Sequence, residues 1–158
     1  MFEPESSARR WGRQSIFEKT CPFPDRRMID TVGHCLTMSY NFAICAPPVP
    51  MNDSEAWERI DDFIKADGPP PPVFRWIHDE LTARYPCICT LSDDRVDSDG
   101  VWSDGPLWND FGHRVAVLGL IYSRVEEVLP FVIETATGLG LSVFDWGGPT
   151  IYRPATTT

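Results

Sequence analysis

The chain has 158 residues and a formal net charge of −9 at pH 7, with 42% hydrophobic and 23% charged residues. This composition is typical of a soluble globular domain, and the length suits one domain. The longest apolar run, residues 115–122, is far shorter than the ~20 residues that a membrane helix needs. The N-terminal sequence lacks the apolar stretch of a signal peptide, and five irregularly spaced cysteines favour a reducing, cytoplasmic location.

The charge is unevenly distributed along the chain. Residues 1–37 carry six Lys/Arg against five Asp/Glu, a net of +1, whereas residues 38–158 carry eight against eighteen, a net of −10. Such an acidic surface repels nucleic-acid backbones and anionic membranes, so we expect neither as a direct partner. The acidity favours a basic protein partner, or it serves solubility alone.

Composition also predicts the domain organisation. Residues 1–37 mix charges with proline and glycine and show no helix or strand period, which predicts a poorly ordered leader or extension. A regular pattern begins at Met38, so we expect a single folded domain over 38–153 and a flexible tail over 154–158.

The first half of the domain predicts one strand followed by two helices. Residues 40–46 alternate and are rich in strand formers. Asn52 with Glu55 three residues later predicts a capped helix start. Pro72 suits the first turn of a second helix, and Pro86 ends it.

The second half is dominated by the apolar run at 114–122, which predicts a central strand covered on both faces. Residues 87–91 form a short strand candidate before it. Ser123 and Glu126 predict a second capped helix, in which Pro130 predicts a kink or a delayed start.

Residues 141–146 read as the last clear strand, and residues 150–152 as a short edge strand. The order β-α-α-(β)-β-α-β predicts an α+β domain, a two-layer sandwich with a small mixed sheet and helices packed mainly on one face.

The most distinctive segment is 93–110, an acidic stretch with two tryptophans. Loops on a rigid scaffold often carry recognition residues, with aromatic anchors and charges that steer a partner. The alternative is that the tryptophans only pin the segment to the domain. The predicted partner-binding residues are Asp93, Asp94, Asp97, Asp99, Trp102, Asp104 and Trp108.

A calcium loop fails in this segment. With Gly100 at the invariant sixth position, Arg95 falls on the first ligand and Pro106 on the bidentate glutamate. The segment therefore reads as a solvated acidic loop, and an irregular calcium site is the alternative.

A zinc site also fails. Cys87 and Cys89, with His78 and His113, lack the usual ligand spacing, and alternate residues of a strand point to opposite faces. We therefore predict no metal and no cofactor.

Two other functions remain open from the residues alone. His113 near Asp104 or Asp110 suggests a small hydrolase or metal-dependent enzyme. Carboxylates along the first helix suggest a mimic of nucleic acid; these are Glu55, Glu58, Asp61 and Asp62.

Four segments carry a resemblance to known proteins: SYNFAI at 39–44, DELTARYP at 79–86, WSDGPL at 102–107, and the helix-strand run at 123–145. They resemble a group of small, largely uncharacterised bacterial proteins, some of which are regarded as immunity partners of toxins. The resemblance implies a non-enzymatic binding protein that neutralises a basic toxin or effector domain, with no catalytic residues.

Overall fold

The computed structural model describes residues 39–155, so the predicted leader at 1–37 lies outside the described residues. Among these described residues, four strands form one sheet with the order β2-β1-β3-β4. Their bounds are Ser39–Cys45 for β1, Val115–Ile121 for β2, Ser142–Asp145 for β3 and Thr150–Tyr152 for β4. Within the described residues, no helix is long and apolar enough to cross a membrane.

The sheet is antiparallel throughout, so the prediction of a mixed sheet is wrong. Phe42 of β1 pairs with Leu118 of β2 on one side and with Asp145 of β3 on the other. β2 and β3 therefore run in the same direction, but β1 lies between them. A strand-helix-strand unit does not create a parallel ladder when a third strand occupies the space between its strands.

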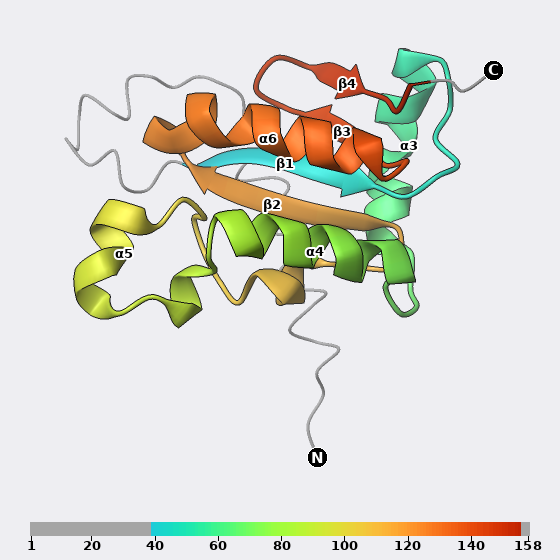
Figure 1. Cartoon of the computed structure of the whole chain (residues 1–158). Coiled ribbons are helices and arrows are strands. Elements are labelled where there is room, and N and C mark those ends of the chain that lie inside the picture. Colours follow the sequence, from blue (N-terminus) through green and yellow to red (C-terminus); the bar gives the residue numbers. More distant parts are fainter. Residues whose placement is uncertain (1–38, 156–158) are drawn as a thin grey trace.

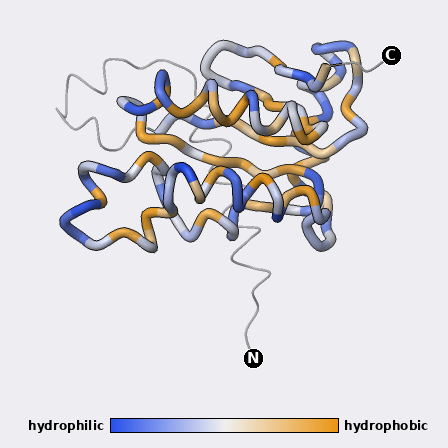
Figure 2. Tube along the Cα trace, viewed as in Figure 1, coloured by the Kyte–Doolittle hydropathy of each residue, from blue (hydrophilic) through white to orange (hydrophobic). Residues whose placement is uncertain are grey.

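Helices cover both faces of the sheet, which confirms the α+β class. α4 (Pro72–Arg84) and α6 (Val125–Gly138) lie on one face, while α3 (Asp53–Lys65) lies on the other (Figure 1). Because alternate strand residues face opposite ways, Phe42 packs into the α4–α6 core and Ala43 into the α3 core. β2 is correspondingly a nearly continuous hydrophobic stretch of the trace (Figure 2). α3 thus adds a third layer to the predicted two.

Two of the three predicted helix starts are confirmed. The Asn52 side chain accepts a 3.0 Å hydrogen bond from the Glu55 backbone N–H, and α4 begins at Pro72. The Ser123 cap is wrong: a 3-10 turn, η4 (Tyr122–Arg124), precedes α6, and no side chain caps the helix. α6 continues through Pro130.

β2 is covered on both faces as predicted, but it is an edge strand and not a central one. The chain at 101–112 lies along its outer edge. Ile121 donates a 2.8 Å backbone hydrogen bond to Val101, and Ser103 donates a 2.9 Å bond to Gly119. These bonds satisfy backbone groups that an edge strand would otherwise expose.

Local turns replace the predicted strand at 87–91. The Thr90 N–H donates to the Cys87 carbonyl oxygen at 2.9 Å, closing the 3-10 turn η2 (Ile88–Thr90). The acidic segment that follows holds the short helix α5 (Asp93–Asp99) and a second 3-10 turn, η3 (Leu107–Asp110). Acidic residues in the first turn favour helix formation at this position.

Candidate functional site

The acidic segment divides into an exposed helix and a largely buried second half. α5 projects away from the sheet, beyond the end of β2 (Figure 1), and none of its residues is buried. The side chains of Asp93, Asp94 and Asp97 are exposed. The structure therefore gathers the four predicted aspartates of this helix, including Asp99, on one small protrusion.

Arg124, the last residue of η4 and the residue directly before α6, holds the C-terminal end of α5. The Arg124 guanidinium donates to the carbonyl oxygens of Ser98 at 3.3 Å and Gly100 at 3.5 Å. The same side chain forms an ion pair with Glu127 at 2.9 Å. Because two carbonyls and a carboxylate share this one cation, Arg124 fixes α5 relative to the start of α6.

One carboxylate of α5 is paired within the helix. Arg95 contacts Asp99 at 2.6 Å, and this hydrogen-bonded pair lowers the pKa of Asp99. Across the described part of the chain, Asp93, Asp94 and Asp97 form no ion pair. These three charges face solvent and act on whatever approaches the protrusion.

Trp102 lies in the core, where it cannot reach a partner. Only 1% of the residue is exposed, and its indole N–H donates a 2.8 Å hydrogen bond to the Tyr85 carbonyl oxygen. An isolated bridge also pairs it with Leu120 of β2. The structure thus places this tryptophan in the alternative role, as the residue that pins the segment to the domain.

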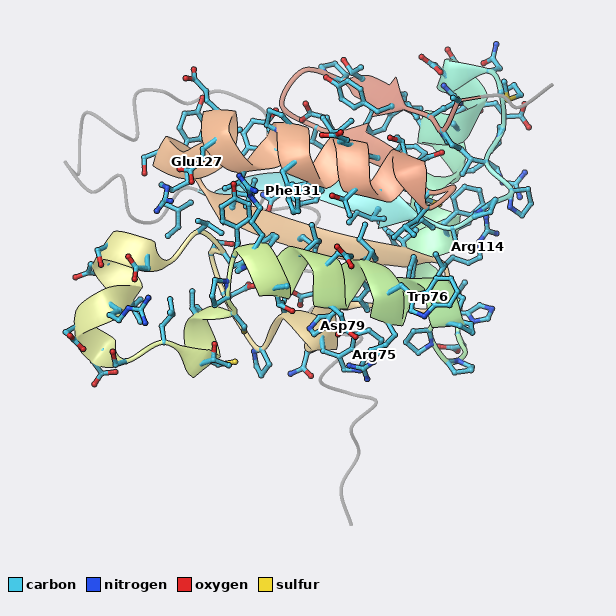
Figure 3. The ribbon with its side chains drawn as sticks, in the orientation of Figure 1. Arg75, Trp76, Asp79, Arg114, Glu127 and Phe131 are labelled. Carbon is cyan, nitrogen blue, oxygen red and sulfur yellow. The ribbon has the colours of Figure 1, made fainter. Side chains whose placement is uncertain are left out.

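Trp108 is half-buried in an aromatic stack. Its ring stacks on Phe111 with centroids 5.2 Å apart, and it meets the His78 ring in a T-shaped contact with centroids 5.3 Å apart. The Arg75 guanidinium lies 3.8 Å from the ring centroid, a cation–π distance. Figure 3 shows Arg75 on α4 next to Trp76, which is 63% exposed. Trp76 was not among the predicted residues.

His113 is tied to the connection between α3 and α4. Its Nδ1 lies 2.8 Å from the Pro69 carbonyl oxygen, and its ring packs against Gly68. Asp104 and Asp110 are half-buried. Within residues 39–155, no three His, Cys, Asp or Glu side chains are grouped closely enough to hold a metal ion.

The turn after α4 brings two cysteines together, contrary to the prediction that they point apart. The sulfurs of Cys87 and Cys89 are 2.9 Å apart. The expected separation assumed an extended strand, whereas the chain turns here through η2 and does not extend. The C-x-C spacing was the available sequence signal.

Protein-family models, curated proteins and solved structures give no match to this chain. The resemblance to immunity proteins therefore stays a prediction. The class that fold and site define is an antiparallel α+β domain carrying an acidic, solvent-exposed helix.

Proposed function

We propose that this chain is a non-enzymatic, acidic binding protein of the cytoplasm whose α5 carboxylates bind a basic protein, such as a toxin or effector domain. The observation that carries the proposal is the exposure of Asp93, Asp94 and Asp97 on a helix that buries none of its residues. A helix without buried side chains contributes little to the core. Its charges are free to meet a partner.

The net negative charge of the whole domain also favours a basic protein partner. Residues 39–155 carry eight Lys/Arg against eighteen Asp/Glu, a net of −10. A surface of one sign raises the rate of encounter with a protein of opposite sign, and salt screens the effect. Removing rim charges changes the association rate more than the dissociation rate.

The contacts that hold α5 in place favour partner binding by its carboxylates. Arg124 holds the helix end, so the carboxylates are presented in one arrangement, which reduces the ordering cost of association. Trp102 has no part in the proposed contact, because it is buried.

The test compares two triple variants with equal charge change. One carries Asp93→Asn, Asp94→Asn and Asp97→Asn on α5. The matched control alters three exposed acids on α3, across the sheet; its changes are Glu58→Gln, Asp61→Asn and Asp62→Asn.

Each bait is used for affinity capture from the native host, and association rates of the captured protein are then measured at low and high salt. We expect a basic protein to bind wild type and the α3 control, and to associate at least about tenfold more slowly with the α5 variant. Equal loss in both variants would show that net charge alone acts. Equal binding by all three baits would reject the α5 site.

A further inference from the structure

The turn between α4 and α5 carries two thiols in direct contact. Cys87 and Cys89 flank Ile88, and their sulfurs are 2.9 Å apart. Both are free cysteines. A disulfide has a sulfur–sulfur distance of about 2.05 Å, so a small movement of the side chains would join them.

The two thiols differ in access to solvent. Cys89 is exposed, whereas Cys87 is buried at 7% exposure. The Leu107 backbone N–H donates a hydrogen bond to the Cys87 sulfur at 3.4 Å. A side chain at Gly105 would meet this sulfur at 3.0 Å, so the backbone there packs closely against it. An external reagent therefore reaches Cys89 first and finds Cys87 immediately behind it.

A cavity of about 340 Å³ opens beside the pair. Its wall includes both cysteines, His78 and Trp108, with prolines and Leu107 completing a mainly apolar lining. This space admits a small reactant to the sulfurs. Among the described residues, no third ligand joins the two cysteines to form a metal-binding group. We therefore consider reactions of the thiols themselves.

We propose that Cys87 and Cys89 form a reversible dithiol/disulfide site that exchanges with a low-molecular-weight disulfide such as glutathione disulfide. The Cys89 thiolate attacks one sulfur of the reagent, forms a mixed disulfide and releases one thiolate. The Cys87 thiolate then attacks the Cys89 sulfur and releases the second. The protein loses two electrons and two protons, and the reagent is reduced to two thiols.

The hydrogen bond between the thiols raises the pKa of Cys89, so the first step accelerates as the solution is made more alkaline. Since only thiolates attack disulfides, a pH dependence of this direction is expected. Oxidation would lock the turn that leads directly into α5.

The experiment uses the full chain in glutathione buffers of increasing oxidised fraction, followed by quenching with a maleimide and digestion with trypsin. Arg84 and Arg95 make residues 85–95 one tryptic peptide that holds both thiols of the site. The other cysteines fall on peptides 20–26 and 28–59, which serve as internal controls. Oxidation of the pair gives an unlabelled 85–95 peptide lighter by two hydrogen atoms.

We expect this disulfide to form and to be reversed by excess dithiothreitol. In Cys87→Ser, Cys89 should accumulate a mixed disulfide with glutathione, and in Cys89→Ser, Cys87 should remain reduced. A synthetic 85–95 peptide tests the contribution of the fold. To reach the same extent of oxidation as the folded chain, the peptide should need a ratio of glutathione disulfide to glutathione that is at least about tenfold higher. The reason is that the fold does not hold its two sulfurs in contact.

Two results would overturn the proposal. One is a wild-type chain that accumulates glutathione on Cys89 without forming the disulfide. The other is a synthetic peptide that oxidises at the same ratio as the folded chain.

Discussion

The indole N–H of Trp102 donates a 2.8 Å hydrogen bond to the carbonyl oxygen of Tyr85, the residue that follows the last turn of α4. The bond satisfies a buried donor and acceptor together. It also joins the acidic segment to the α4–α6 core, since Tyr85 packs edge-on against Phe131 of α6 with ring centroids 5.7 Å apart. Figure 3 shows Phe131 on the lower side of α6, the side that faces α4. The segment that looks like a recognition loop in sequence is therefore partly structural.

Replacing Trp102 with Phe should lower the free energy of unfolding by about 1–3 kcal/mol, because the Tyr85 carbonyl is left buried and unpaired. Urea unfolding measures the difference. The control is Trp76→Phe, at a residue that is 63% exposed, where the change should stay within about 0.5 kcal/mol. Similar values for the two variants would show that the Trp102 bond carries no stability.

The edge of β2 offers a second test through its glycine. A Cβ at Gly119 would collide with the Ser103 hydroxyl and would lie 3.1 Å from Asn41 Oδ1. Gly119→Ala should therefore push the covering chain off the edge and cost about 1–3 kcal/mol of unfolding free energy. Gly138→Ala is the matched control, because no atom lies within 4 Å of its Cβ position. It should be neutral or slightly stabilising in thermal unfolding.

Local signals in the sequence predict the starts of α3 and α4, but not α5 or the start of α6. The Asn52 cap and the proline at the start of α4 depend on neighbouring residues only, so they are readable without the fold. The order of the strands is not predictable from such local signals. The apolar run of β2 predicts burial on both faces, but its edge position depends on β1 pairing with both β2 and β3, and no local pattern encodes that choice.

In the candidate site, too, some residues have an exposure that the sequence predicts, whereas the placement of others depends on the fold. The exposure of Asp93, Asp94 and Asp97 follows from their polarity. Trp102 is different, because its burial is created by contacts with Tyr85 and Leu120, which are distant in sequence. A tryptophan among aspartates has no helix or strand period that would predict this. The contact of Cys87 and Cys89 was missed because the prediction assumed a strand where a 3-10 turn forms.

Tyr40 provides a pH-dependent prediction. Its hydroxyl donates a 2.5 Å hydrogen bond to the Asp145 carboxylate. Burial and this bond raise the pKa of the Tyr40 phenol well above its usual value. The folded state thus keeps a proton that the unfolded chain releases near pH 10, so this contribution is complete below about pH 10 and is lost as the pH rises.

Tyr40→Phe should lower stability at neutral pH by about 1–2 kcal/mol through loss of the hydrogen bond. It should also remove part of the alkaline decline. Urea unfolding of both proteins between neutral pH and pH values above about 10 measures this. A variant whose stability falls as steeply as that of the wild type would contradict the role of Tyr40.

Cys45 should resist alkylation in the native protein. It is fully buried in β1, and burial raises the pKa of its thiol to about 11 even though Arg114 acts to lower it. At pH 8 only about one thiol in a thousand is then ionised, and that thiolate is shielded from solvent. Iodoacetamide should therefore modify exposed Cys89 much faster than Cys45. Fragment ions of peptides 85–95 and 28–59 measure this, because they separate Cys89 from Cys87 and Cys45 from Cys35.

The raised pKa of Cys45 also makes the free energy of unfolding depend on pH. Because the folded pKa lies above that of an unfolded cysteine, the contribution of Cys45 is complete below about pH 8.5 and falls as the pH rises through 11. Cys45→Ala removes this contribution, so the free energy of unfolding of the variant should decline less steeply between those pH values than that of the wild type.

Urea concentrations that begin to unfold the chain should make Cys45 accessible to alkylation. If Cys45 reacts as fast as Cys89 without urea, the sheet opens locally at β1 and the packing of α3 over this strand is not maintained in solution.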